Sequence, residues 1–264
     1  MTEDFDTIRI AIDQRGIARL TLNRPEKHNA LNAAMIADLR RAADQIAAAA
    51  GKIRAVVLDG AGKTFCAGGD LGWMKDQAAK DRMGKLDEAR GLAEMLAALN
   101  DLPQPLIARV HNAAYGGGIG MMCVADLAIV AEGCTFALSE TRLGLIPATI
   151  GPFVIRRMGE GFARQVFFTA QAFGTDLALR AGLAAEIVPE ADLDAAVERQ
   201  ITAILATAPG AVASAKALAK KLGGPDPRAE IEMTINALAD RWEDDEAATG
   251  IAAFFARETP PWAR

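Results

Sequence analysis

The chain has 264 residues, of which 51% are hydrophobic and 24% charged, so it is expected to be globular with a substantial buried core. Its formal net charge of −5 argues against a nucleic acid or an anionic membrane surface as a partner. Three cysteines cannot all pair with one another, and none has metal-ligand spacing, so we expect reduced thiols and a cytoplasmic protein. The acidic N-terminus shows no apolar signal segment, and no apolar run is long enough to predict a membrane span.

The first predicted element is a β-hairpin, with strands at 8–13 and 17–22 joined by a turn at 14–16. Asn32 then predicts the N-cap of a helix that runs to about residue 50 and ends at Gly51. Apolar residues recur on one face of this helix at Ile36, Leu39, Ala43 and Ile46.

The middle of the chain alternates predicted strands with glycine-rich loops and helices. The strands are expected at 55–59, 106–110, 127–131 and 135–138, the glycine-rich loops at 60–72 and 116–118, and a helix at 86–99. After about residue 151 the pattern is mostly helical, apart from a short strand at 185–188. The alternation predicts an α/β fold with a helical C-terminal third.

The glycine-rich segments 65–70 and 115–120 each follow a predicted strand. The GAGKT run at 60–64, just before the first segment, is not a phosphate-binding loop, because the early glycine that this pattern needs is Val57. The second segment lacks the G-x-G-x-x-G spacing of a dinucleotide-binding loop. Two such loops side by side can direct two backbone N–H groups at one carbonyl oxygen. Each donor of this kind typically lowers a barrier by about 3–4 kcal/mol when negative charge develops on that oxygen.

Other catalytic arrangements have little support in the sequence. The two histidines, His28 and His111, lack metal-binding spacing, and Ser139 is not part of a hydrolase nucleophile motif. His111 follows an apolar strand and is expected to be structural. Glu140 follows an apolar run, and two readings stay open: a desolvated general acid/base, or a capping or surface glutamate paired with Arg142.

Together these segments resemble the enoyl-CoA hydratase/isomerase (crotonase) superfamily. The similar motifs are LNRPEKHNAL at 22–31, FCAGGDL at 65–71, the glycines 116–118 with Ala125-Asp126, and FALSE at 136–140 followed by GLIP at 144–147. The resemblance implies a spiral of β-β-α units of the ClpP-like kind over residues 1–195, and a helical oligomerisation region at 196–264. It also implies assembly as a homotrimer or a dimer of trimers.

The resemblance assigns roles to particular residues. It makes the Gly69 and Gly117 amides the oxyanion donors and Glu140 the catalytic carboxylate. Coenzyme A, as part of an acyl-CoA substrate, is expected to be bound near Arg24, Lys27, Ala30, Ala67, Asp70 and Leu71. No separate cofactor and no metal are expected.

One departure from the family pattern affects the expected reaction. Typical hydratases carry a second glutamate just after the glycine run, where this chain has Gly120. The segment SETRLGLIPATI at 139–150 looks most like bacterial hydratases that act on branched, carboxylated substrates such as 3-methylglutaconyl-CoA. The leading expectation is therefore hydration of a 2-enoyl-CoA through an enolate. A Δ3,Δ2-enoyl-CoA isomerase that uses Glu140 as its single base and a non-catalytic acyl-CoA binder stay open.

Overall fold

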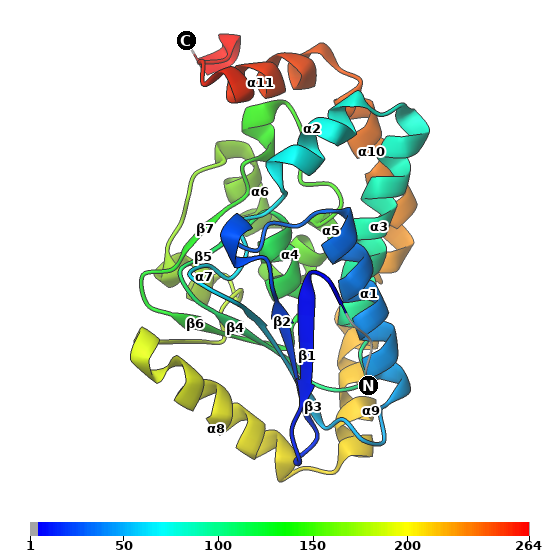
Figure 1. The fold of residues 1–264 in the computed structure, drawn as a ribbon, viewed down its shortest axis with the longest axis vertical. Helices are drawn as coiled ribbons and strands as arrows, with labels where there is room; N and C mark the ends of the chain where they lie inside the picture. Colours follow the sequence, from blue (N-terminus) through cyan, green and yellow to red (C-terminus); the bar gives the residue numbers. More distant parts are fainter. Residues whose placement is uncertain (1–4, 264) are drawn as a thin grey trace.

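The computed structural model describes residues 5–263 as a main sheet flanked by helices, with a smaller sheet beside it (Figure 1). The main sheet has the order β1-β2-β3-β4-β6-β8, in which only β1 and β2 are antiparallel. Its strands are β1 (Ile8–Ile12), β2 (Ile17–Leu22), β3 (Ala55–Gly60), β4 (Leu106–Val110), β6 (Leu127–Ala131) and β8 (Glu186–Val188). The central strands are apolar and buried, as expected for a parallel sheet covered on both faces.

A second ladder runs beside the main sheet and gives the chain its spiral course. It contains β5 (Ala113–Tyr115) paired with β7 (Thr135–Ala137), and isolated bridges extend it on both sides. Ala114 pairs with Phe136 on one side and with Cys66 on the other, while Phe136 also bridges Phe173. The chain thus returns to this ladder after β3, β4 and β6 in turn. The predicted α/β fold of repeated β-β-α units is confirmed.

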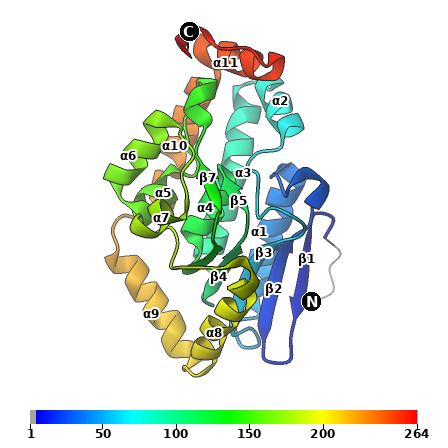
Figure 2. The same cartoon turned by 90° about the vertical axis from the view of Figure 1, so that its left-hand side faces the viewer.

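The helices cover the sheet and one end of the molecule. They are α1 (Ala33–Ala48), α2 (Leu71–Ala79), α3 (Arg82–Asn100), α4 (Gly117–Val124), α5 (Gly151–Met158), α6 (Glu160–Thr169), α7 (Thr175–Arg180), α8 (Leu193–Leu205), α9 (Pro209–Leu222), α10 (Ile231–Trp242) and α11 (Asp245–Ala256). Short 3-10 turns are η1 (Pro25–Lys27), η2 (Glu140–Leu143), η3 (Glu190–Asp192), η4 (Pro227–Glu230) and η5 (Pro261–Ala263). Figure 2 shows α8 and α9 as a V at the end of the molecule opposite α11.

Local sequence signals explain several helix boundaries. The Asn32 side chain accepts a hydrogen bond from the Met35 amide at 2.9 Å, which confirms it as the N-cap of α1. All four predicted apolar positions of α1 are buried. The helix ends at Ala48, before the predicted stop at Gly51. The helix predicted at 86–99 begins earlier, because Asp81 caps α3 through the Gly84 amide.

The loop prediction for 60–72 is wrong at its end, because α2 begins at Leu71. The Asp70 side chain accepts hydrogen bonds from the Gly72 and Trp73 amides and so forms an N-cap. The glycines nearby had suggested a loop, but glycine is tolerated in the first turn of a capped helix. This short helix lies at the same end of the molecule as α11 (Figure 1).

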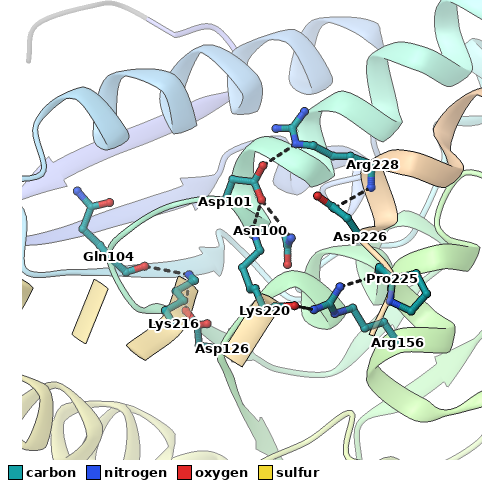
Figure 3. Close-up of polar contacts among 10 residues, drawn as sticks. All are labelled: Asn100, Asp101, Gln104, Asp126, Arg156, Lys216, Lys220, Pro225, Asp226 and Arg228. Carbon is teal, nitrogen blue, oxygen red and sulfur yellow. Dashed lines mark hydrogen bonds and ion pairs between the residues drawn. The ribbon is translucent and has the colours of Figure 1, made fainter. Parts of the chain in front are cut away.

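A polar network attaches α9 to the body of the protein (Figure 3). The Lys216 ammonium donates to the Asp126 carboxylate at 2.6 Å, and its side chain is only 11% exposed. Asp101, at the end of α3, pairs with both Lys220 and Arg228. The boundary predicted after residue 195 falls inside α8, and the assembly role of 196–264 stays a prediction.

Within 5–263, no single helix is long and apolar enough to cross a membrane. The stretches Glu190–Leu205 and Pro209–Leu222, which meet at 105°, are long and apolar enough only when taken together as a bent pair.

Candidate active site

The two glycine-rich segments run side by side in the smaller ladder. The Cys66 amide donates to the Ala113 carbonyl at 3.2 Å, and the Tyr115 amide donates to the Cys66 carbonyl at 3.0 Å. These bonds bring residues 66–69 next to 113–117, as the sequence had predicted. The loop after β3 and the start of α4 therefore share one wall of a cavity.

Gly68 and Gly116 shape the backbone directly before the two predicted oxyanion donors. Their φ angles are +90° and +47°, a region that side chains other than glycine rarely adopt. The next amides, those of Gly69 and Gly117, have no hydrogen-bond acceptor anywhere in residues 5–263. Both residues line the cavity, and Gly117 opens α4, where the helix leaves its first N–H groups unpaired. Two free donors therefore border the same space.

The cavity has a volume of about 450 Å³ and a mostly apolar lining. The walls come from segments that are far apart in sequence. Its apolar lining residues include Leu71, Trp73 and Met74 of α2, Leu92 of α3, Ile146 and Pro147 after η2, Leu238 and Trp242 of α10, and Phe254 of α11. Such a lining suits an acyl chain.

Glu140 places a carboxylate in this cavity from the first position of η2. Its Oε2 atom is buried and has no hydrogen-bond partner in the described chain. Burial raises the pKa of Glu140 to about 7, opposed only by a hydrogen bond from its own backbone N–H. A β-carbon on Gly116 would stand 3.5 Å from Glu140 Oε1, so the carboxylate sits against the second glycine loop. A carboxyl group with a pKa near neutrality can both accept and return a proton.

The alternative reading of Glu140 as one half of an ion pair with Arg142 does not match the structure. Within residues 5–263, Glu140 takes part in no salt bridge, and the exposed Arg142 side chain has neither a salt bridge nor a hydrogen bond. Arg142 instead lines the cavity.

Gly120 lies inside α4 and is closely surrounded. A β-carbon there would stand 2.9 Å from Ile150 Cγ2 and 3.2 Å from Leu96 Cδ1. Ile150 belongs to the 139–150 segment that resembles the hydratases of branched, carboxylated substrates. Its side chain occupies the space into which a longer residue at position 120 would project.

Arg24 and Asp70 join the first loop to the start of α2. The Arg24 guanidinium donates to Asp70 Oδ2 at 2.9 Å and to the Ala30 carbonyl at 2.6 Å. Burial alone would raise the pKa of Asp70, but hydrogen bonds from Arg24 and the Trp73 amide hold it below its ordinary value. Arg24 is thus engaged within the protein, and its predicted contact with coenzyme A stays a prediction.

The other predicted coenzyme A contacts divide into two groups. Ala67 and Leu71 line the cavity. Lys27 is exposed outside it, and Ala30 is buried outside it. Asp70 likewise lies outside the lining, although its neighbours on both sides belong to it.

The two histidines lie outside the cavity lining. The His111 Nε2 atom is 3.0 Å from the Gly62 carbonyl, and the ring is buried, as expected for a structural residue. His28 Nδ1 lies 3.3 Å from the Thr64 hydroxyl. Among residues 5–263, no cluster of three or more His, Cys, Asp or Glu side chains could hold a metal ion.

The C-terminal helices contribute to the site in a way that the sequence did not predict. A β-carbon on Gly250 of α11 would stand 2.7 Å from the Leu143 carbonyl oxygen, so this helix packs backbone to backbone against η2. Arg241 of α10 donates to the Gly144 carbonyl from Nη2 at 2.8 Å and from Nε at 3.0 Å. These contacts fix the turn that carries Glu140. Helical periodicity marks an apolar face but does not identify its partner.

Comparisons with known proteins agree with this arrangement. The family model described as "Enoyl-CoA hydratase/isomerase" matches residues 13–264. A probable enoyl-CoA hydratase from Rhodobacter capsulatus is 34% identical over 259 residues, which cover 97% of both chains. The crystal structure of an enoyl-CoA hydratase from Shewanella pealeana has a TM-score of 0.80 and 34% identity, covering 98% of this chain and 96% of its own. A putative enoyl-CoA hydratase from Mycobacterium avium paratuberculosis has a TM-score of 0.87 and 28% identity, covering 97% and 99%. The chain therefore belongs to the enoyl-CoA hydratase/isomerase family and has the crotonase fold.

Proposed function

We propose that this protein hydrates a 2-enoyl-CoA thioester, with Glu140 as the acid/base group. The observation that carries the proposal is the location of a carboxylate, whose buried Oε2 atom has no partner in the described chain, in the same apolar cavity as two backbone amides without acceptors. A pKa of about 7 for Glu140 allows it to act as a base and then as an acid near neutral pH.

The proposed reaction runs through an enolate. Glu140 accepts a proton from water as the water oxygen bonds to the β-carbon, and the π electrons of the double bond move toward the thioester oxygen. The Gly69 and Gly117 amides stabilise the charge on that oxygen. Glu140 then returns the proton to the α-carbon, so that H and OH have been added overall and the base is regenerated.

We further propose a branched or carboxylated acyl group of the 3-methylglutaconyl kind. Arg142 is the single cation among the cavity-lining residues of the described chain, and its side chain has no partner there. Other cations near the acyl region are less suitable. Arg82 pairs with Asp240 and Glu243, and Arg156 faces other cavities.

The second candidate function is Δ3,Δ2-enoyl-CoA isomerisation, which needs one base to move one proton. Gly120 favours it, since no second carboxylate borders the cavity at that position. The sequence that follows Glu140 favours hydration instead. A third possibility is a non-catalytic acyl-CoA binder. Binding alone would not account for the raised pKa of Glu140 or for the two free amides.

We also propose that the chain acts in the cytoplasm as a homotrimer or a dimer of trimers. An apolar groove of about 720 Å³ lies between α5, α6 and α10, with Phe168 70% exposed and Met233 59% exposed. Burial of these side chains between copies of the chain would be favourable. Sedimentation of the purified protein tests the assembly.

Turnover on a small panel tests the function. The substrates are crotonyl-CoA, 3-methylglutaconyl-CoA and a 3-enoyl-CoA, assayed with the wild-type chain, Glu140→Gln and Arg142→Met in ¹⁸O-labelled water. We expect label in the product, a loss of turnover in Glu140→Gln, and a raised KM in Arg142→Met for the carboxylated substrate alone. Double-bond migration without label would establish the isomerase, and full hydration by Glu140→Gln would exclude Glu140 as the base.

A further inference from the structure

Thr149 is a buried polar residue in the segment between η2 and α5. It is 5% exposed, and its hydroxyl oxygen has no hydrogen-bond partner within residues 5–263. Thr149 also lines the cavity that contains Glu140. Buried hydroxyl groups in folded proteins nearly always have a partner, so this one is suited to meet a group that enters the cavity.

Buried side-chain polar atoms without a partner are few in the described chain, and two of them belong to residues that line this cavity. Six buried side-chain polar atoms lack a partner in the described chain. Four of them, on Arg54, Asp59, Gln104 and His111, belong to residues outside the cavity lining. The remaining two are Glu140 Oε2 and Thr149 Oγ1. Among these buried atoms, the residues that line the active cavity thus contribute one carboxylate oxygen and one hydroxyl oxygen.

These two atoms complement an attacking water molecule. Water has two hydrogens to donate while its lone pair attacks carbon, and a single carboxylate oxygen orients only one of them. Position 120 cannot supply a second acceptor, because it is a glycine whose outward space is filled by Ile150. Thr149 is the neighbour of Ile150 in the chain, so the segment that fills this space also brings a threonine to the cavity lining.

We propose that the Thr149 hydroxyl, together with Glu140, holds the nucleophilic water in position for attack on the β-carbon. This inference rests on the proposed hydratase function and adds to it a second water-binding residue. Water donates one hydrogen to Glu140 and the other to Thr149 Oγ1. The first hydrogen is transferred as the carbon–oxygen bond forms and is later returned to the α-carbon, while the hydroxyl of Thr149 keeps its own proton. The second hydrogen stays on the product hydroxyl.

The test compares Thr149→Val, which has nearly the same shape but no hydroxyl, with Thr149→Ser, which keeps it. For hydration of a 2-enoyl-CoA we expect Thr149→Val to lower kcat by about 10- to 100-fold, with KM little changed, since a lost hydrogen bond to a reacting group has this effect. Thr149→Ser should recover most of the rate. Full kcat in Thr149→Val, or a change confined to KM, would overturn the inference.

A partial reaction separates this role from a structural one. Exchange of the α-protons of a saturated acyl-CoA in deuterated water needs the base and the two amides, but no attack by water. We expect Thr149→Val to retain this exchange at the wild-type rate. Parallel loss of exchange and hydration would show that Thr149 only supports the site, and would overturn the inference.

Glu140→Gln distinguishes failure of the inference from failure of the proposed function. If Glu140→Gln loses hydration and Thr149→Val keeps it, only the role of Thr149 is refuted. If Glu140→Gln hydrates at the wild-type rate, or if the wild-type chain hydrates no enoyl-CoA, the proposed function and the inference fall together.

Discussion

Replacement of Glu140 by glutamine is expected to stabilise the folded protein at alkaline pH while it removes the proposed base. The pKa of Glu140 rises from 4.5 to about 7 on folding, so the folded state disfavours the ionised form. The contribution of Glu140 to stability is fully present at pH values below its pKa in the unfolded chain. It is lost as the pH rises through its pKa in the folded protein. A difference of this size corresponds to about 3 kcal/mol of folding free energy at pH 8.

Urea unfolding of the wild type and Glu140→Gln at pH 8 and pH 5 measures this effect. Glutamine keeps the size of the side chain and carries no charge, so it mimics the protonated acid. The variant should be more stable than the wild type by about 3 kcal/mol at pH 8 and by less than about 1 kcal/mol at pH 5. Glu132→Gln, at an exposed turn outside the cavity, is the matched control and should show no such pH-dependent gain. The reasoning would be refuted if the free energies of unfolding of Glu140→Gln and the wild type differed equally at both pH values. It would also be refuted if Glu140→Gln were less stable than the wild type at pH 8.

Three further predictions concern the rate, the oxyanion donors and the attachment of α9. The hydration kcat should rise with pH through an apparent pKa of about 7, because the ionised form of Glu140 is the base; a profile flat from pH 5 to 9 would contradict its role. Gly117→Ala should lower kcat by about 100-fold, since a β-carbon there would meet Leu31 Cδ1 at 2.5 Å and move the amide; steady-state kinetics check this. Asp126→Asn should destabilise the protein by roughly 2 kcal/mol in urea unfolding, because it leaves the buried Lys216 ammonium with the Gln104 carbonyl but no carboxylate, and adding Lys216→Met should recover most of the loss.

Much of the architecture could be predicted from sequence because the signals are local. The Asn32 cap and the apolar face of α1 rest on helical spacing, and the buried strands rest on short apolar runs bounded by glycine or polar residues. The nearness of the two glycine-rich loops could also be anticipated, because parallel strands bring the loops that follow them to one edge.

The unpredicted features depend on contacts between distant segments. Nothing in the residues around Arg24 indicates that its guanidinium pairs with Asp70, which follows another strand. The closure of the site by α10 and α11 likewise depends on tertiary packing of Arg241 and Gly250 against η2. The desolvation of Glu140 was only one of two open readings, because burial of a carboxylate is set by the whole fold.

The departure at Gly120 was visible in the sequence, but its physical basis was not. A double-mutant cycle with Gly120→Ala and Ile150→Ala tests whether the two positions share one space. Gly120→Ala adds helix propensity of about 1 kcal/mol but drives a methyl group against Ile150 Cγ2, for a net destabilisation of about 1–2 kcal/mol. Ile150→Ala opens a cavity and should destabilise by roughly 2–4 kcal/mol.

In the double variant the new methyl group enters the space that the isoleucine has vacated. In urea unfolding, the destabilisation of the double variant should therefore be smaller than the sum of the two single-variant destabilisations by about 1 kcal/mol or more. At independent sites the two would add within about 0.5 kcal/mol. Strict additivity would show that Ile150 does not exclude a side chain at position 120. Coupling would explain why this chain carries no carboxylate there, because the Ile150 side chain occupies the space that a glutamate at position 120 would need.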